Sequence, residues 1–185
     1  MTATTLDRTT ALILIDLQKG IAAFAAEFGV DQVIANAERL AAAFRERGLP
    51  VVLVNVTGGA PGRTEQGARR TGDLPADWAE LVLPVEPGDI TVTKQTWGAF
   101  HGTGLDEQLR KHGVTQVVIG GVATSIGVES TARAAHELGY HVTVATDVVT
   151  DMDPVSHEHS IKRIFPRLGE TGSSAELVAL LDQRG

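Results

Sequence analysis

Five short runs rich in Val, Ile, Leu and Thr predict β-strands over residues 10–17, 51–56, 89–94, 115–119 and 140–146. The first run is apolar at almost every position up to Asp16, which is typical of a strand buried on both faces of a parallel sheet. Apolar residues at helical spacing predict helices over 31–47, 104–112, 156–165 and 173–182, and a further helix whose first turn holds residues 126–129. Strands that alternate with helices predict an α/β fold, a three-layer α/β/α sandwich around a mainly parallel, Rossmann-like sheet.

Residue types that end or interrupt regular structure mark a helix and a loop. Asp31 is suited to the N-cap of helix 31–47, because its carboxylate can accept hydrogen bonds from the first amides, and Gly48 is suited to the C-terminal stop. Segment 57–73 is rich in Gly, Thr and Arg without an apolar period, so we expect a long surface loop, a candidate lid or oligomer contact. Its arginines are either solvated or suited to an anion: Arg63, Arg69 and Arg70.

Composition places the chain among globular proteins. Its 185 residues are 43% hydrophobic and 21% charged, which suits one domain over residues 1–185. A net charge of -7 argues against a nucleic-acid partner, since binding to a phosphate backbone needs clustered Lys and Arg. No apolar run approaches the ~18 residues of a membrane span, and residues 1–12 show no leader pattern, so we expect a cytoplasmic protein with no membrane partner.

Charged residues end two of the predicted strands, and a Gly-rich corner follows a third. Asp16 closes the first strand, Lys94 closes the third, and residues 123–127 form the corner after the fourth. In a parallel sheet these ends lie on one edge, so an acid, an amine and the unpaired amides of a helix N-terminus would share one crevice. Such a group is suited to proton transfer and to binding a developing oxyanion.

Each of these residues also has a purely structural explanation. Asp16 is suited to capping the following helix, Lys94 to a solvated strand end, and Gly127 to the close packing of a helix on a sheet. Trp97 and Phe100 follow Lys94 closely and would either contact a small planar substrate or cover the core or an oligomer contact. The sequence leaves both explanations open for all five residues.

Three separated motifs resemble the isochorismatase-like hydrolases, also called the cysteine hydrolase superfamily. They are LILIDLQKG around Asp16, VTKQTWGAFHGTGLDEQLRKHGV around Lys94, and GGVATSIGVESTARAAHELGYHVTVATD around Gly127. The resemblance covers about residues 10–181. It implies the α/β/α fold of that family, a small-molecule substrate and a homo-oligomer.

In most members of that family the catalytic triad is Asp, Lys and Cys, and the resemblance places these roles at Asp16, Lys94 and position 127. Position 127 is Gly, and the chain contains no cysteine, so attack on an amide by a thiolate is excluded. We expect substrate or oxyanion binding at the corner, namely at Val122, Ala123 and Ile126, and candidate substrate contacts just after Lys94, at Trp97 and Phe100.

The true isochorismatases are similar in having Gly where the others have Cys. In them the Asp is a general acid on a vinyl ether while water attacks, which implies this role for Asp16, with Lys94 balancing the charge. They carry Tyr-Ala-His in the corner, whereas this chain has Val122, Ala123 and Thr124, so isochorismate itself is not assigned as the substrate. The family also tends to have a cis peptide bond that would fall between Val122 and Ala123.

Two hydroxyls lie near position 127 in the sequence. Ser125 is expected to be the N-cap of the helix, and Ser130 lies about one turn further on. Nothing adjacent in sequence offers the His that usually activates a serine, so we expect neither residue to replace the thiol.

No metal and no cofactor are expected. Relatives that bind a divalent metal use an Asp-x-His pair and a further His after the second strand, and the stretch VNVTGGAP contains no His. His157 and His159 are two residues apart on a predicted helix and would not face each other. GGVATSIG does not match the dinucleotide fingerprint, although Asp147 ends the next strand, where a ribose-binding acid would lie.

Three functional hypotheses follow from these residues. The leading one is a small-molecule hydrolase that works without cysteine through Asp16 and Lys94, with vinyl-ether hydrolysis as the candidate reaction. The second is a binding or structural member of the family that has kept the pocket and lost the chemistry. The third is an amidohydrolase whose Cys at position 127 was replaced.

Overall fold

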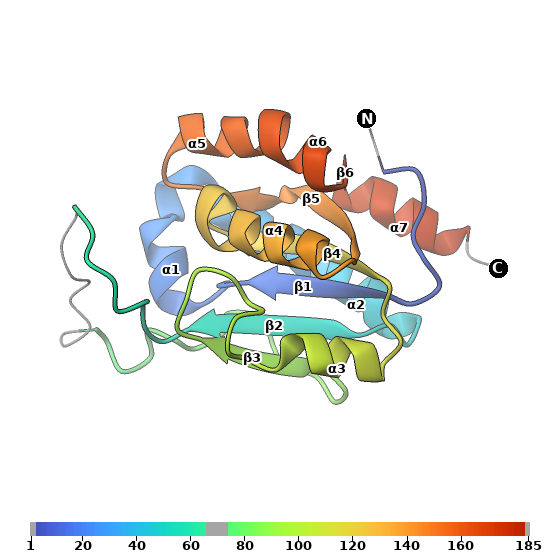
Figure 1. Cartoon of the computed structure of the whole chain (residues 1–185), viewed down its shortest axis with the longest axis horizontal. Helices are drawn as coiled ribbons and strands as arrows, with labels where there is room; N and C mark the ends of the chain where they lie inside the picture. Colours follow the sequence, from blue (N-terminus) through green and yellow to red (C-terminus); the bar gives the residue numbers. More distant parts are fainter. Residues whose placement is uncertain (1–2, 66–73, 184–185) are drawn as a thin grey trace.

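The computed structural model describes residues 3–65 and 74–183 and contains a six-stranded sheet (Figure 1). The strand order is β3-β2-β1-β4-β5-β6, and each neighbouring pair is parallel. The strands are β1 Thr10–Ile15, β2 Val51–Val56, β3 Ile90–Lys94, β4 Gln116–Val122, β5 His141–Thr150 and β6 Glu170–Gly172. All their carboxyl ends therefore lie along one edge, as the alternating pattern predicts.

Helices cover both faces of the sheet (Figure 1). Helices α2 and α7 pack on one face, and α3, α4 and α6 pack on the other. The helical segments are α1 Lys19–Phe24, η1 Ala26–Phe28, α2 Val30–Glu46, α3 Leu105–Lys111, the π-helical turn η2 Thr124–Val128, α4 Glu129–Glu137, α5 Pro154–His159, the π-helical turn η3 Ser160–Ile164, α6 Phe165–Leu168 and α7 Ser174–Asp182. The predicted three-layer sandwich is confirmed.

Strand β1 shows why its run is apolar throughout. All six of its residues are buried, and successive side chains point to opposite faces. Leu12 and Leu14 belong to the core under α2 and α7, whereas Ile13 and Ile15 belong to the core under α3 and α4. A central strand between two helical layers has no polar face, so its sequence shows no alternation.

The start of α2 differs from the expectation. Gly29, with φ 73°, is the N-cap residue and α2 begins at Val30, so Asp31 lies in the first turn and is not the cap. Its carboxylate still lies at the positive end of the helix. Gly48 follows the end of α2 with φ 64°, as its role as a stop requires.

Three elements in the carboxyl-terminal half are longer or additional. Strand β5 runs to Thr150 and not to 146, because the β4–β5 register shifts after Ile119 and pairing then resumes near the end of β5. The predicted helix 156–165 begins at Pro154 and continues through η3 and α6 to Leu168. Strand β6 was not expected, since three residues give no apolar period.

The described part of the predicted loop, residues 57–65, contains no helix or strand, and Arg63 is exposed there. Arg69 and Arg70 lie outside the described residues. No helix in the described part of the chain is long and apolar enough to cross a membrane.

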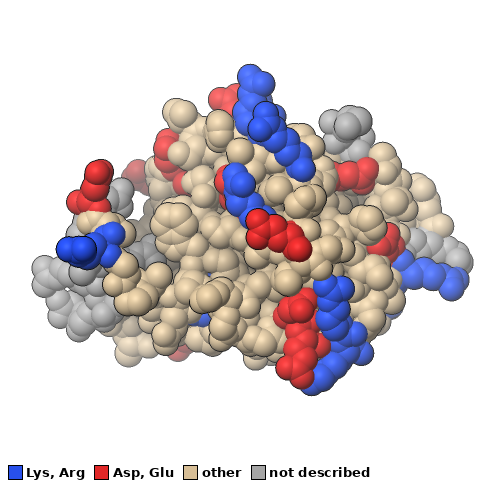
Figure 2. Space-filling view, viewed as in Figure 1, with Lys and Arg blue, Asp and Glu red and all other residues tan. Residues whose placement is uncertain are grey.

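Charged side chains of opposite sign lie next to each other on the face shown in Figure 2. Four ion pairs join residues one helical turn apart, namely Asp106–Arg110, Glu107–Lys111, Glu129–Arg133 and Glu158–Lys162. Lys and Arg therefore do not gather on this face into the kind of basic patch that binds a phosphate backbone.

Candidate functional site

Asp16 and Lys94 meet at the carboxyl edge of the sheet. Asp16 directly follows β1, and Lys94 is the last residue of β3, two strands away. The long Lys94 side chain spans the intervening β2, and its Nζ donates to Asp16 Oδ2 at 2.7 Å. The structure thus brings together the acid and the amine that the strand ends predicted.

The backbone at Asp16 turns the carboxylate toward this contact. Its φ of 53° lies in the left-handed region, and no other non-glycine residue in the described ranges has a positive φ. Asp is one of the few residue types that tolerate this conformation, and such outliers cluster at functional sites. Asp16 accordingly does not cap α1, whose N-cap residue is Gln18.

The Asp16–Lys94 pair is almost fully buried, with exposed fractions of 6% and 2%. Lys94 Nζ also donates to the Thr96 carbonyl at 3.1 Å, which fixes the ammonium from a second direction. A buried ion pair adds little to stability because desolvation offsets the attraction, but losing one partner typically costs about 3–5 kcal/mol. The pair therefore adds little net stability, although each partner depends on the other.

The corner after β4 completes the site. The Val122–Ala123 peptide bond is cis, as the resemblance implies, and the chain then enters the π-helical turn η2. Gly127 lies on this turn, facing Asp16. An ideal Cβ at Gly127 would lie 2.9 Å from Ile15 Cγ2 and 3.2 Å from Asp16 Oδ2. A side chain at position 127 would thus lie directly beside the carboxylate.

Asp151 holds the corner from behind. The Ser125 amide and hydroxyl both donate to Asp151 Oδ2 at 2.7 Å, and Asp151 is itself buried. Ser125 is therefore not the N-cap, since Ala123 takes that position. Sequence reasoning missed Asp151 because it placed the end of the fifth strand at Asp147. The rule that singled out Asp16, a carboxylate directly after a strand, would have found it had the true end of β5 been known.

A small cavity of about 40 Å³ opens between these elements. Its wall comes from six segments of the chain and consists of Asp16, Ile21, Val56, Gly58, Lys94, Thr96, Trp97, Val122, Ala123, Ile126, Gly127 and Met152. Trp97 is 58% exposed and lies at the opening. Seven of the eight expected site residues therefore line one cavity.

Phe100 is the expected site residue that does not line the cavity. Its ring stacks on Tyr140 with 5.9 Å between centroids and packs against the core under α3 and α4. Of the two explanations for Phe100, the structure supports packing. The Ile126 amide, expected to help bind an oxyanion, donates to the Ala123 carbonyl at 3.1 Å and so already has an acceptor.

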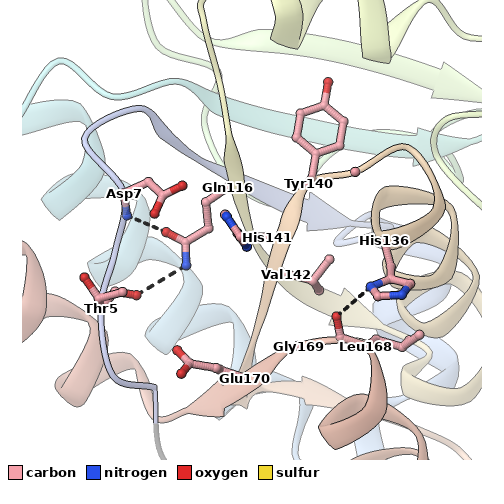
Figure 3. A pocket seen from close by; sticks show the side chains of 11 residues that line it. Thr5, Asp7, Gln116, His136, Tyr140, His141, Val142, Leu168, Gly169 and Glu170 are labelled. Carbon is pink, nitrogen blue, oxygen red and sulfur yellow. Dashed lines mark hydrogen bonds between the residues drawn. The ribbon is translucent and has the colours of Figure 1, made fainter.

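A larger hollow of about 470 Å³ lies at the opposite edge, where β4, β5 and β6 begin (Figure 3). Some of its polar groups are bonded to one another. Gln116 accepts from the Asp7 amide and donates to the Thr5 carbonyl, and His136 Nδ1 donates to the Leu168 carbonyl. The described residues that line this hollow include no Lys beside a carboxylate, so the smaller cavity is the better candidate for proton transfer.

Two of the remaining candidate polar residues, His157 and Asp147, have structural partners. His157 Nδ1 lies 2.8 Å from the Thr124 hydroxyl. Asp147 accepts from the amide and hydroxyl of Ser174 at the start of α7, and this contact gives its carboxylate a structural role. Among residues 3–65 and 74–183, no three His, Asp or Glu side chains are grouped to hold a metal ion.

Comparison with known proteins agrees with the motifs. The Isochorismatase domain family matches residues 10–176. YwoC, an uncharacterized isochorismatase family protein of Bacillus subtilis, is 44% identical over 177 residues, covering 91% of this chain and 92% of that protein. The ureidoacrylate amidohydrolase RutB of Pseudomonas syringae is 32% identical over 176 residues, covering 78% and 72%.

Solved structures agree as well. An isochorismatase family protein from Burkholderia thailandensis superimposes with a TM-score of 0.89 at 39% identity, covering 96% of this chain and 98% of that one. The family match and the structural similarity thus agree with each other. The chain belongs to the isochorismatase family of hydrolases.

Proposed function

We propose that this protein hydrolyses a small vinyl ether by direct attack of water, with Asp16 as general acid and Lys94 balancing the charge. The observation that carries the proposal is the buried 2.7 Å contact between Asp16 and Lys94 beside Gly127. The chain contains no thiol, and the one hydroxyl among the described residues of the cavity wall, on Thr96, donates to the Gly98 carbonyl. A reaction that needs a proton but no protein nucleophile fits this wall best.

The proton can move within the pair without a change of net charge. An ion pair of carboxylate and ammonium converts to a neutral carboxylic acid and amine when Lys94 Nζ gives its proton to Asp16 Oδ2. The neutral acid then protonates the terminal carbon of the vinyl ether, forming a C–H bond and an oxocarbenium ion. The Asp16 carboxylate left behind stabilises this cation across the cavity.

Water completes the reaction. Its oxygen adds to the cationic carbon and its proton passes to the Asp16 carboxylate, which restores the acid. The resulting hemiketal transfers its hydroxyl proton to the ether oxygen, the C–O bond breaks, and a carbonyl compound and an alcohol leave. Gly127 has no side chain, so the space beside Asp16 Oδ2 is open to the substrate.

A panel of vinyl ethers, amides and ureas tests the proposal. We expect turnover of at least one vinyl ether, and the reaction in D₂O should put one deuterium on the protonated carbon of the product. Amides and ureas should remain unchanged. Turnover of amides or ureas without vinyl-ether turnover would overturn the proposed reaction.

An amidohydrolase is the second candidate, because RutB, a relative at 32% identity, is an amidohydrolase. In this chain such a reaction would need a nucleophile other than a thiol. Gly127→Cys distinguishes the two cases, since gain of amide hydrolysis in this variant would support an amidohydrolase ancestry with a replaced cysteine. Intact-mass measurement of the quenched variant would detect the acyl-enzyme.

A silent binding protein is the third candidate, favoured by the small size of the cavity. Isothermal titration with small carboxylates, amides and vinyl ethers addresses it. Binding of a panel member without turnover of any member would support this role.

The expected homo-oligomer and single domain also enter as proposals. Exposed apolar side chains on α1, after β3 and on α5 favour self-association, namely Phe24, Trp97 and Val155. Light scattering after size-exclusion chromatography should give a multiple of 19.5 kDa. A single cooperative unfolding transition at fixed protein concentration should accompany it.

A further inference from the structure

Among the residues that the structure describes, the wall of the carboxyl-edge cavity carries no net charge. Asp16 and Lys94 are the ionisable residues of this described wall, and they contact each other at 2.7 Å. Their charges sum to zero whichever partner holds the shared proton. We infer that the substrate of this site is an uncharged small molecule that lacks a carboxylate on the part that enters, an inference that rests on the proposed function.

The rest of the wall is apolar and comes from separate elements. Ile21 of α1, Val56 of β2, Val122 of β4, Ile126 of η2 and Met152 after β5 surround the pair. A carboxylate that entered would lose its water and meet no uncompensated cation, because the Lys94 charge is already balanced at close range. Burial of an unpaired charge is strongly unfavourable, whereas an uncharged group loses far less on entry.

Hydrogen bonding at Lys94 favours the same class of ligand. An ammonium has three donors, and Lys94 Nζ directs two of them to Asp16 Oδ2 and the Thr96 carbonyl. One donor is left for the cavity. A single donor suits one ether or carbonyl oxygen of an uncharged substrate, while a carboxylate needs several donors to replace its hydration.

The dimensions of the cavity limit what it can enclose. A volume of about 40 Å³ accommodates about three water molecules, and so a reacting group of a few non-hydrogen atoms. The remainder of the substrate must lie at the opening, where Trp97 and Met152 expose apolar surface. The part outside is therefore also better matched by an uncharged, partly apolar group.

Nearby cations do not change this balance among the described residues. Lys19, at the start of α1, pairs with Glu80 and Asp77, and the hydrogen bonds that its Nζ donates to these two carboxylates raise the pKa of Lys19. Arg63 is exposed on the loop after β2 and does not line the cavity. Lys94 remains the one basic residue of the described cavity wall.

Matched substrate pairs test the inference on the wild-type protein. Each pair shares one reacting group, a vinyl ether or an amide, and differs directly next to that group in a carboxylate against a carboxamide of the same shape. We expect kcat/KM for the uncharged member to exceed that for the carboxylate by at least about tenfold. Equal turnover, or preference for the carboxylate, would overturn the inference and leave the proposed reaction standing.

Failure of the proposed reaction gives a different result. If no member is turned over, binding of the same pairs, measured by isothermal titration calorimetry, still decides the substrate class. Tighter binding of the uncharged members would support the inference while removing the reaction. Absence of binding by either member at millimolar concentration would overturn both.

Asp16→Asn provides a charge test with a readout other than activity. The amide removes the negative charge at nearly constant shape and leaves the Lys94 ammonium uncompensated. We expect the carboxylate members to bind this variant at least about tenfold more tightly than wild type, and the uncharged members to bind about equally. Asp147→Asn, the same exchange outside the cavity wall, should leave both affinities unchanged.

The variant must be folded for this comparison. Circular dichroism and the melting temperature check it, and the wild-type pairs decide the question if Asp16→Asn does not fold. Unchanged carboxylate affinity in folded Asp16→Asn would contradict the view that Asp16 cancels the Lys94 charge.

Discussion

Addition of one methyl group at Gly127 should disturb the site in a way that can be calculated from its surroundings. Gly127 has no positive φ, so Ala can adopt its backbone conformation, and any cost of Gly127→Ala comes from contacts. The new Cβ would lie 2.9 Å from Ile15 Cγ2, 3.2 Å from Asp16 Oδ2 and 3.5 Å from the Trp97 carbonyl. The first two contacts are too short and require Ile15 or Asp16 to move.

Two opposing effects set the magnitude. Ala in place of Gly within a helix favours folding by about 1 kcal/mol. Insertion of a methyl group into a well-packed site costs about 1–3 kcal/mol, because neighbours leave their preferred rotamers. We therefore expect the free energy of unfolding of Gly127→Ala to fall by up to about 2 kcal/mol, and kcat/KM to fall with it as Asp16 is displaced.

Urea denaturation measures the change, with Gly62→Ala as the matched control. A Cβ at Gly62 meets nothing within 4 Å, and Gly62 has no positive φ, so this variant isolates the effect of Ala on the unfolded chain. Gly127→Ala should be less stable than Gly62→Ala. If Gly127→Ala is as stable as the control and keeps full activity, the close packing of Gly127 against Asp16 is wrong.

Three further predictions concern residues around the site and the core. Asp151→Ala should lower the free energy of unfolding in urea by about 1–3 kcal/mol, because the amide and hydroxyl of Ser125 lose their acceptor. Ser125→Ala should lower it by only about 1 kcal/mol and should keep the wild-type turnover, whereas loss of turnover would be expected if Ser125 were a nucleophile. Trp97→Ala should raise KM at an unchanged melting temperature, and Phe100→Ala should lower the melting temperature at an unchanged KM. Burial, with a hydrogen bond to Asp106, raises the pKa of Tyr140, so the stabilisation from Tyr140 should be complete below pH ~10 and lost progressively above it, and the stability of the wild type should fall more steeply there than that of Tyr140→Phe. Because Tyr140 is the one tyrosine, absorbance of the phenolate near pH ~10 in the folded protein would contradict this.

Much of the fold follows from local patterns. The apolar run of β1 and the helical spacing of α2 reflect burial directly, and the bounds of these elements lie within about two residues of the expected ones. Short or cooperative features do not leave such a pattern. β6 has three residues, and the extension of β5 depends on a register shift in its pairing with β4, a property of two strands together.

The site likewise contains residues that the sequence could identify and residues whose role depends on the folded structure. Asp16 and Lys94 were found because charged residues at the ends of buried strands are conspicuous, and a parallel sheet aligns those ends. Spacing does not encode which way a side chain turns after a strand, so Trp97 at the cavity and Phe100 on Tyr140 were indistinguishable in the sequence. The role of Asp151 likewise depends on where β5 ends.

The most direct test of the account is the kcat/KM of Asp16→Asn on a vinyl ether that the wild type hydrolyses, expressed per folded molecule. A general acid contributes about 10²–10⁴-fold, so a loss of at least about 100-fold is predicted. Asp147→Asn should keep the wild-type value, since Asp147 bonds to Ser174 outside the cavity wall. Activity of folded Asp16→Asn within about threefold of wild type would contradict the assignment of Asp16 as the acid.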